Sequence, residues 1–203
     1  MPILALLSVC LAPFTWVLLK VIFSVVLDTN YFGADAGIEL VTFFGQIATL
    51  FLCLTLSFSS LGKISKTWGI PRMRRILGLS VFFYATLHLL SYLIFLGGLE
   101  VGTYFHDLMT KKRIIFGSLA YFFLFLLAAT SFDSAVRNLA KVWSLLHRLV
   151  YFIAGLVVLH VFLSSKANFA FAFFFFLRIF DFNWPAFTKS LEMNRTVPPF
   201  FRA

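Results

Sequence analysis

The sequence predicts an all-α fold: a polytopic membrane helical bundle of about six transmembrane helices. Hydrophobic residues make up 61% of the 203 residues and charged residues 12%, and the mean hydropathy is +0.96. A water-soluble domain of this size needs more polar surface. Apolar stretches near the ~20 residues that a spanning helix requires recur along the chain. The polar segments between them are too short to form a second core, so residues 1–203 are expected to form a single transmembrane domain.

Six apolar stretches define the expected spans. The first lacks a basic leading region and an obvious small-residue cleavage site, so we interpret it as a retained helix rather than a signal peptide. The sixth is short and is interrupted by Arg178, which either snorkels to the headgroups or marks a helix end. The expected spans are 2–27, 40–61, 76–97, 114–132, 145–164 and 167–182.

Basic residues between the spans indicate how the bundle is oriented. The segment after the first span has only acidic charges, whereas the segments after the second and fourth spans are basic. By the positive-inside rule, both termini are expected in the cytoplasm. The run KKR at 111–113 opposes this orientation. The net charge of +9 follows from the loop bias, so no nucleic-acid partner is expected. The inward-facing basic residues are Lys63, Lys66, Arg72, Arg74, Arg75, Arg137 and Lys141.

Two histidines lie inside apolar stretches, where a titratable side chain is costly unless a partner holds it. His88 is fourteen residues after Arg74, and His160 is thirteen after His147, so each lies ~20 Å from the inner side, toward the outside. Neutral imidazole is a standard axial ligand of haem iron. The pair therefore predicts a b-type haem held between the third and fifth spans. The alternative is that each histidine only hydrogen-bonds a neighbouring helix.

A third histidine, His147, opens the fifth span. Thirteen residues at ~100° each turn it ~140° away from His160, and no histidine lies thirteen or fourteen positions before His88, where Arg75 and Arg74 stand. A symmetric two-haem arrangement is therefore not expected. His147 is either a further metal ligand or a polar residue at the membrane interface.

Other polar residues in or near the spans have simpler interpretations. Arg148 suits a haem propionate, a flavin phosphate or a lipid phosphate equally well. Lys20 either snorkels to the outer interface or pairs with a cofactor carboxylate. Cys10 and Cys53 are expected to be packed thiols, and His106 an ordinary loop residue. Because the chain has no CxxC, CxxCH, dinucleotide or P-loop motif, any nucleotide-binding domain must come from another chain.

The chain also resembles a known family. Over about residues 30–166 it combines RRILGL, ATLHLLSY, a fourth span that ends in Thr-Ser, and LHRLVYFIAGLVVLH. This combination resembles MsrQ, also called YedZ, within the ferric-reductase-like transmembrane superfamily, with a core at about residues 37–166. The three histidines His88, His147 and His160 each match a histidine of that family. The chain departs from the family's pattern after Lys166 and at the KKR that follows Thr110.

The resemblance implies a function. MsrQ is a haem b membrane subunit, also flavin-binding (FMN), that passes electrons from the quinone pool to MsrP. MsrP is a periplasmic molybdopterin enzyme that reduces methionine sulfoxide in envelope proteins, so this chain is expected to perform no methionine chemistry itself. The resemblance implies that His88 and His160 clamp a haem near the outer side. An inner region for quinol or FMN is then implied around Arg74, Arg75, His147 and Arg148.

Three alternatives remain open. A ferric or oxygen reductase of the same superfamily needs a flavin and nicotinamide domain, which only a separate reductase chain would supply. A quinol-oxidising cytochrome b subunit of another dehydrogenase shares the histidine clamp. A non-redox transporter subunit or assembly factor with structural histidines predicts no chromophore.

Overall fold

The computed structural model describes residues 2–28, 31–64 and 70–164, and all regular secondary structure in these ranges is helical. One of the elements, η1, is a short π-helix that continues directly from α3. The elements are α1 (Pro2–Val26), α2 (Ala36–Ile64), α3 (Ile70–Ser91), η1 (Tyr92–Leu96), α4 (Val101–Thr110), α5 (Lys112–Ala129), α6 (Asp133–Leu146) and α7 (Leu149–Ser164).

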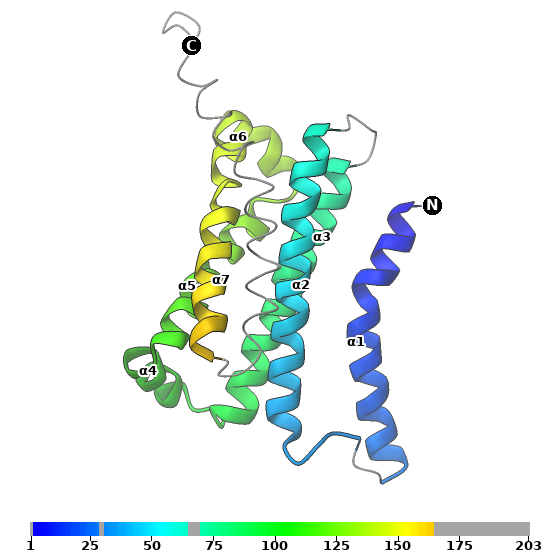
Figure 1. The fold of residues 1–203 in the computed structure, drawn as a ribbon, viewed down its shortest axis with the longest axis vertical. Helices are drawn as coiled ribbons and strands as arrows, with labels where there is room; N and C mark the ends of the chain where they lie inside the picture. The colour runs from blue at the N-terminus through cyan, green and yellow to red at the C-terminus, as the bar shows by residue number, and fades with distance from the viewer. Residues whose placement is uncertain (1, 29–30, 65–69, 165–203) are drawn as a thin grey trace, which may run out of the picture.

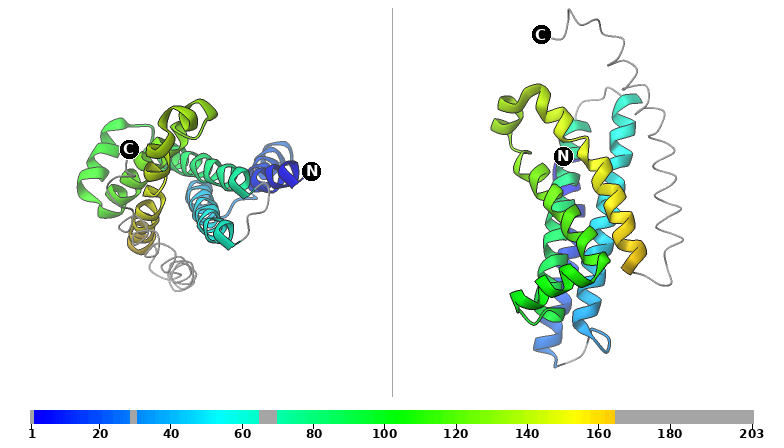
Figure 2. Two further views of the ribbon diagram at one scale, coloured as in Figure 1. Left: turned by 90° about the horizontal axis from the view of Figure 1, so that it is seen from above. Right: turned by 90° about the vertical axis from the view of Figure 1, so that its left-hand side faces the viewer.

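The long helices run side by side, up and down along one axis (Figure 1). Helix α3 is central, because it contacts α1, α2 and α5, while α7 packs mainly against α5. The view from above in Figure 2 shows α1 at one side of the bundle and α5 with α7 at the other. Two antiparallel helix pairs, α2 with α3 and α5 with α7, therefore form the body of the fold.

Four helices are long and apolar enough to cross a membrane: Ile3–Val26, Ala36–Phe58, Arg72–Leu96 and Lys112–Ala129. Helix α7 is apolar but shorter, at 16 residues. These five helices occupy the first five stretches in which the sequence predicts spans. The sixth expected span, 167–182, lies outside the described residues.

Two further helices occupy segments that the sequence analysis treats as loops. The expectation of a loop at His106 is wrong, because this residue lies in α4, and the basic segment after the fourth span forms α6. Both helices are amphipathic, with polar residues such as Asp133 and Arg137 one turn apart. Their apolar residues recur with a helical period instead of forming a continuous run, so a search for spanning stretches does not find them.

The core centres on Tyr84, whose side chain is completely buried and stacks on Phe51 with ring centroids 5.5 Å apart. Its hydroxyl donates a hydrogen bond of 2.7 Å to the Cys10 carbonyl of α1 and accepts one of 3.1 Å from the Phe14 N–H. In a regular helix those two backbone groups bond to each other. Pro13, which has no N–H to donate, lies between them in α1, and the Tyr84 hydroxyl bonds to both groups. Tyr84 thereby fastens α1 to α3.

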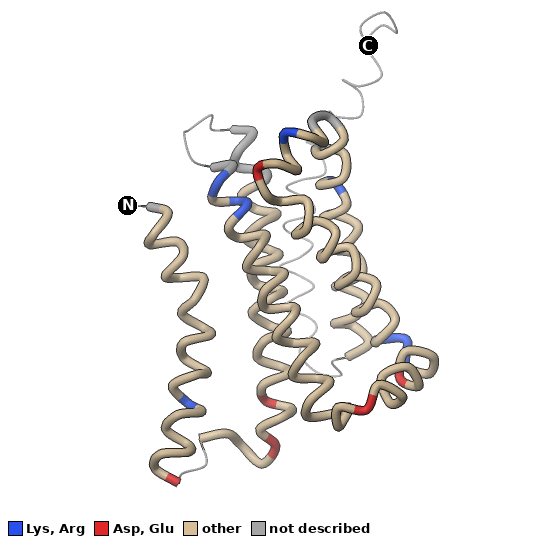
Figure 3. The backbone as a smooth tube through the Cα atoms, turned by 180° about the vertical axis from the view of Figure 1, so that it is seen from behind, with Lys and Arg blue, Asp and Glu red and all other residues tan. Residues whose placement is uncertain are grey.

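The charged residues gather at the two ends of the bundle (Figure 3). The end formed by α6 and by the starts of α3 and α7 is basic. Asp133 is the single acidic residue of this end within the described part, and it pairs with Arg75 at 2.6 Å. The opposite end has mixed charge, with the remaining described acidic residues and the Lys111 to Arg113 run. The arginines of the basic end are Arg72, Arg74, Arg75, Arg137 and Arg148.

Candidate functional site

The structure brings His88 of α3 and His160 of α7 together. Their ring centroids are 6.0 Å apart and their ring planes are nearly perpendicular, at 87°. Both rings are partly buried, and both histidines lie within the last turn or so of their helices, α3 and α7. The matching depth expected from the fixed rise of a helix is therefore found in the structure.

Each of the two imidazoles has one nitrogen committed to the backbone of the neighbouring helix. Nδ1 of His88 lies 2.8 Å from the Val41 carbonyl oxygen of α2, and Nδ1 of His160 lies 2.7 Å from the Arg113 carbonyl oxygen of α5. Because a carbonyl oxygen only accepts, Nδ1 must carry the proton in both rings. Nε2 is then the nitrogen with a lone pair, which is the tautomer that metal-binding histidines adopt.

A glycine lies against each imidazole. A Cβ atom at Gly45 would lie 2.9 Å from Nδ1 of His88, and one at Gly117 would lie 2.7 Å from Nδ1 of His160. Both distances are shorter than carbon and nitrogen atoms tolerate without displacement. Neither glycine was predicted as part of the site. The one indication in the sequence is that each glycine precedes its histidine by the same number of residues.

The pair fits the axial positions of a haem. Sites built only from protein ligands need about four donors, and no group of three or more His, Cys, Asp or Glu side chains in the described part of the chain is placed to hold a metal ion. A haem supplies the remaining donors itself and takes its axial ligands from the protein. Two metal–nitrogen bonds of about 2 Å, with about 1 Å from each nitrogen to its ring centre, place the centroids about 6 Å apart. The observed 6.0 Å agrees with this value.

His147 is placed at the other end of α7, away from the pair. Its ring stacks on Trp143 with centroids 4.0 Å apart. Its Nδ1 lies 3.1 Å from the Trp143 carbonyl oxygen, and its Nε2 lies 3.4 Å from Oγ of Ser131. Burial lowers the pKa of His147 and the Arg74 guanidinium lowers it further, whereas the contact with the Trp143 carbonyl opposes the shift. The ring therefore has a protein partner at each of its nitrogens.

The three arginines predicted for the inner region have different surroundings. Arg75 forms the ion pair with Asp133 and ties α3 to α6; its guanidinium lowers the pKa of that carboxyl group. Arg74 lies within electrostatic range of His147 and Tyr151, and Arg148 lies within range of Tyr151. The charges of Arg74 and Arg148 therefore both act on Tyr151, near the start of α7.

Lys20 of α1 has a protein partner. Its Nζ lies 2.9 Å from Oε1 of Glu39 and 5.5 Å from the centre of the Phe32 ring. The carboxylate that it meets therefore belongs to the chain and not to a cofactor. Cys10 and Cys53 are buried free thiols, as the sequence predicts.

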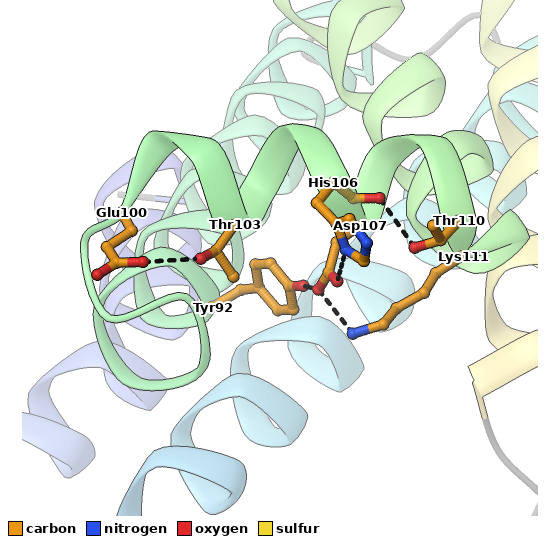
Figure 4. Close-up of polar contacts among 7 residues, drawn as sticks. All are labelled: Tyr92, Glu100, Thr103, His106, Asp107, Thr110 and Lys111. Carbon is orange, nitrogen blue, oxygen red and sulfur yellow. Dashed lines mark hydrogen bonds and ion pairs between the residues drawn. The ribbon is translucent and has the colours of Figure 1, made fainter.

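A buried carboxylate, Asp107 of α4, lies at the centre of a group of polar contacts (Figure 4). It is 6% exposed, accepts a hydrogen bond from the Tyr92 hydroxyl and lies 2.7 Å from Nζ of Lys111. Tyr92 is one helical turn after His88, and Lys111 lies two residues before the Arg113 carbonyl that His160 contacts. The cluster therefore joins α4 and the residue before α5 to η1, which continues directly from the helix of His88. No functional role was predicted for Asp107. The only indication of its ion pair in the sequence is that Lys111 follows it by four residues.

We expect the attachment of α4 to depend on pH through Asp107. The Lys111 ammonium and the Tyr92 hydroxyl hold the pKa of this carboxyl below its ordinary value of 3.8. A lowered pKa in the folded state stabilises the fold fully above the ordinary value, and this contribution is lost as the pH falls through the folded value. Hydrogen-exchange protection factors of residues 101–110 should stay level at neutral pH and fall below pH 3.8. D107N should lower these protection factors at neutral pH and weaken their dependence on pH. Protection factors that vary with pH as in the wild type would contradict this role.

Sequence comparisons with known proteins identify relatives of this chain. Residues 43–159 match the family described as "Ferric reductase like transmembrane component". The chain is 40% identical over 164 residues to the "Protein-methionine-sulfoxide reductase heme-binding subunit MsrQ" of Polaromonas naphthalenivorans, covering 79% of this chain and 72% of that relative. It is 37% identical over 138 residues to the protein of the same name from Klebsiella pneumoniae, covering 68% of each. No solved structure matches. The chain therefore belongs to the MsrQ family of ferric-reductase-like transmembrane proteins.

Proposed function

We propose that the chain is a b-type cytochrome membrane subunit. It passes electrons from the quinone pool, directly or through FMN, across the bacterial inner membrane to a periplasmic molybdopterin methionine sulfoxide reductase of the MsrP type. The observation that carries the proposal is the pair His88 and His160, 6.0 Å apart, with each Nδ1 bonded to a carbonyl. The printed names of the two relatives, as heme-binding subunits, support it.

The chain's own residues would hold the haem and set the donor strength of its ligands. His88 and His160 would hold the haem iron through one Nε2 each, and the two carbonyl contacts would fix the ring orientations and raise the basicity of these nitrogens. The apolar helices around the rings keep water away from them. When bound, the haem supplies a one-electron iron couple.

The proposed topology follows from the charges at the two ends. The end with Arg72, Arg74, Arg75, Arg137 and Arg148 faces the cytoplasm, and the histidine pair lies toward the outer face. The domain spans 1–203 with its family core at 37–166, and a sixth span in the region 167–182 returns the carboxyl terminus to the cytoplasm. Electrons then leave on the side where an MsrP-type partner is located.

The inner region around Arg74, Arg148 and His147 is proposed to accept the electrons, with Arg75 fixing α3 beside it. Guanidinium groups suit the phosphate of FMN, and a neutral imidazole accepts a proton from a quinol hydroxyl. His147 is also the third candidate metal ligand, a role that requires it to exchange its contact with Ser131 or with the Trp143 carbonyl. A separate flavin reductase chain is the alternative donor.

The test is a pigment and electron-transfer measurement on the purified full chain. We expect reducible Soret and α bands, and reduction of the pigment by a quinol in proteoliposomes, followed by its reoxidation when an MsrP-type protein is added. A purified chain without these bands would leave the non-redox alternative. Bands that quinol does not reduce, but a flavin reductase does, would favour the ferric-reductase-type alternative.

A further inference from the structure

The contacts of His88 and His160 are two copies of one arrangement. In each copy, the first helix of an antiparallel pair provides a carbonyl, at Val41 or Arg113, and the second helix provides the histidine 47 residues later. A glycine lies one helical turn after the carbonyl in both copies. The same three elements therefore recur in α2 with α3 and in α5 with α7.

Steric contact explains why the glycine is needed in both copies. The ring is anchored at Nδ1 by a hydrogen bond of 2.8 Å or 2.7 Å to a carbonyl on the same helix as the glycine. A methyl group at Gly45 or Gly117 would lie 2.9 Å or 2.7 Å from that same nitrogen. The ring would have to tilt away, which lengthens or breaks its bond to the carbonyl.

We propose that Gly45 and Gly117 are positioning residues that set the ring planes of His88 and His160 and keep each Nδ1 bonded to its carbonyl. This inference rests on the proposed function, because its consequence is the ligand strength that the pair presents to a haem. Hydrogen bonding by Nδ1 increases the donor strength of Nε2 and favours the ferric state. The two glycines thereby lower the reduction potential of the site.

Two other glycines in the same helices as the histidines provide matched controls. A Cβ at Gly78, on the helix of His88, would have its nearest contact at 4.0 Å, and one at Gly155, on the helix of His160, would meet nothing within 4 Å. Alanine favours helix at all four positions, so the fold is expected to persist in every variant. Only the variants at Gly45 and Gly117 introduce an atom against an imidazole.

The experiment compares G45A, G117A, G78A and G155A in the purified full-length protein. We expect a raised midpoint potential in G45A and in G117A, with wild-type values in the two controls. The ferric low-spin electron paramagnetic resonance signal should have the single large g value of near-perpendicular axial rings in the wild type, and change in G45A and G117A only. Each site is tested separately, so misfolding of one variant leaves the other as the test.

A second readout does not depend on haem. Nitrogen-15 NMR of the imidazoles in the haem-free chain should show a hydrogen-bonded Nδ1–H in the wild type and controls, and its loss for His88 in G45A and for His160 in G117A. Unchanged potentials, resonance signals and imidazole shifts in both variants would overturn the positioning role. If the wild-type chain takes up no haem, but G45A and G117A show these imidazole changes, the proposed function is refuted and the positioning role is upheld.

Discussion

Replacement of His160 by alanine is expected to abolish the low-spin haem absorption of the purified chain, and H88A should do the same. Each substitution removes one of the two imidazoles at the site, and no described cluster of His, Cys, Asp or Glu offers a substitute. The change is measured by the Soret and α bands and by the haem content after extraction. H106A serves as the control, because that side chain is 75% exposed on α4. Full haem occupancy with an unchanged spectrum in H160A would overturn the ligand assignment.

The effect of H147A should differ in kind from that of H160A. His147 lies at the opposite end of α7, where Trp143 and Ser131 contact it. We therefore expect the low-spin spectrum of the pair to persist while haem incorporation weakens or reduction by quinol slows. Comparing the quinol-driven rate with reduction by dithionite, which does not need the inner region, separates these two effects.

Removal of the Tyr84 hydroxyl should destabilise the bundle strongly. In Y84F the Cys10 carbonyl and the Phe14 N–H lose their shared partner in a buried position, at a cost of about 1–3 kcal/mol in the free energy of unfolding. Y84A also removes a fully buried ring, which adds a cavity and costs about 3–5 kcal/mol. Reversible unfolding in mixed micelles measures both changes.

The matched control for Tyr84 is Y31F. Tyr31 is 46% exposed, and phenylalanine preserves its ring contact with Phe23. Its loss of stability should stay within about 0.5 kcal/mol, as for most surface changes. If Y84F were no more destabilising than Y31F, the hydroxyl of Tyr84 would not be what joins α1 to α3.

Much of the fold could be predicted because membrane thickness fixes the length of a spanning helix. Five of the expected spans coincide with apolar helices, and the sixth lies outside the described residues. The amphipathic helices α4 and α6 were not predicted, because half of each helix is polar. Such helices are recognised only by apolar residues that recur with the helical period.

The residues of the candidate site also fall into those that the sequence indicates and those that it does not. His88 and His160 were predicted from sequence, because a buried imidazole in an apolar run is rare and a helix rises by a constant amount per residue. Gly45, Gly117 and Asp107 were not, because a glycine or an aspartate alone does not indicate what it contacts. The hydrogen bond from Tyr92 to Asp107 likewise joins two residues that no pattern in the sequence connects.

The sequence by itself determined a helical membrane bundle and placed two histidines at one depth, because composition selects the solvent and helix geometry fixes height along the axis. Only the tertiary structure decided which faces of the helices meet. That choice depends on the rotation and packing of segments far apart in the chain, and it selects the carbonyls of Val41 and Arg113 and the glycines one turn beyond them as the surroundings of the two imidazoles.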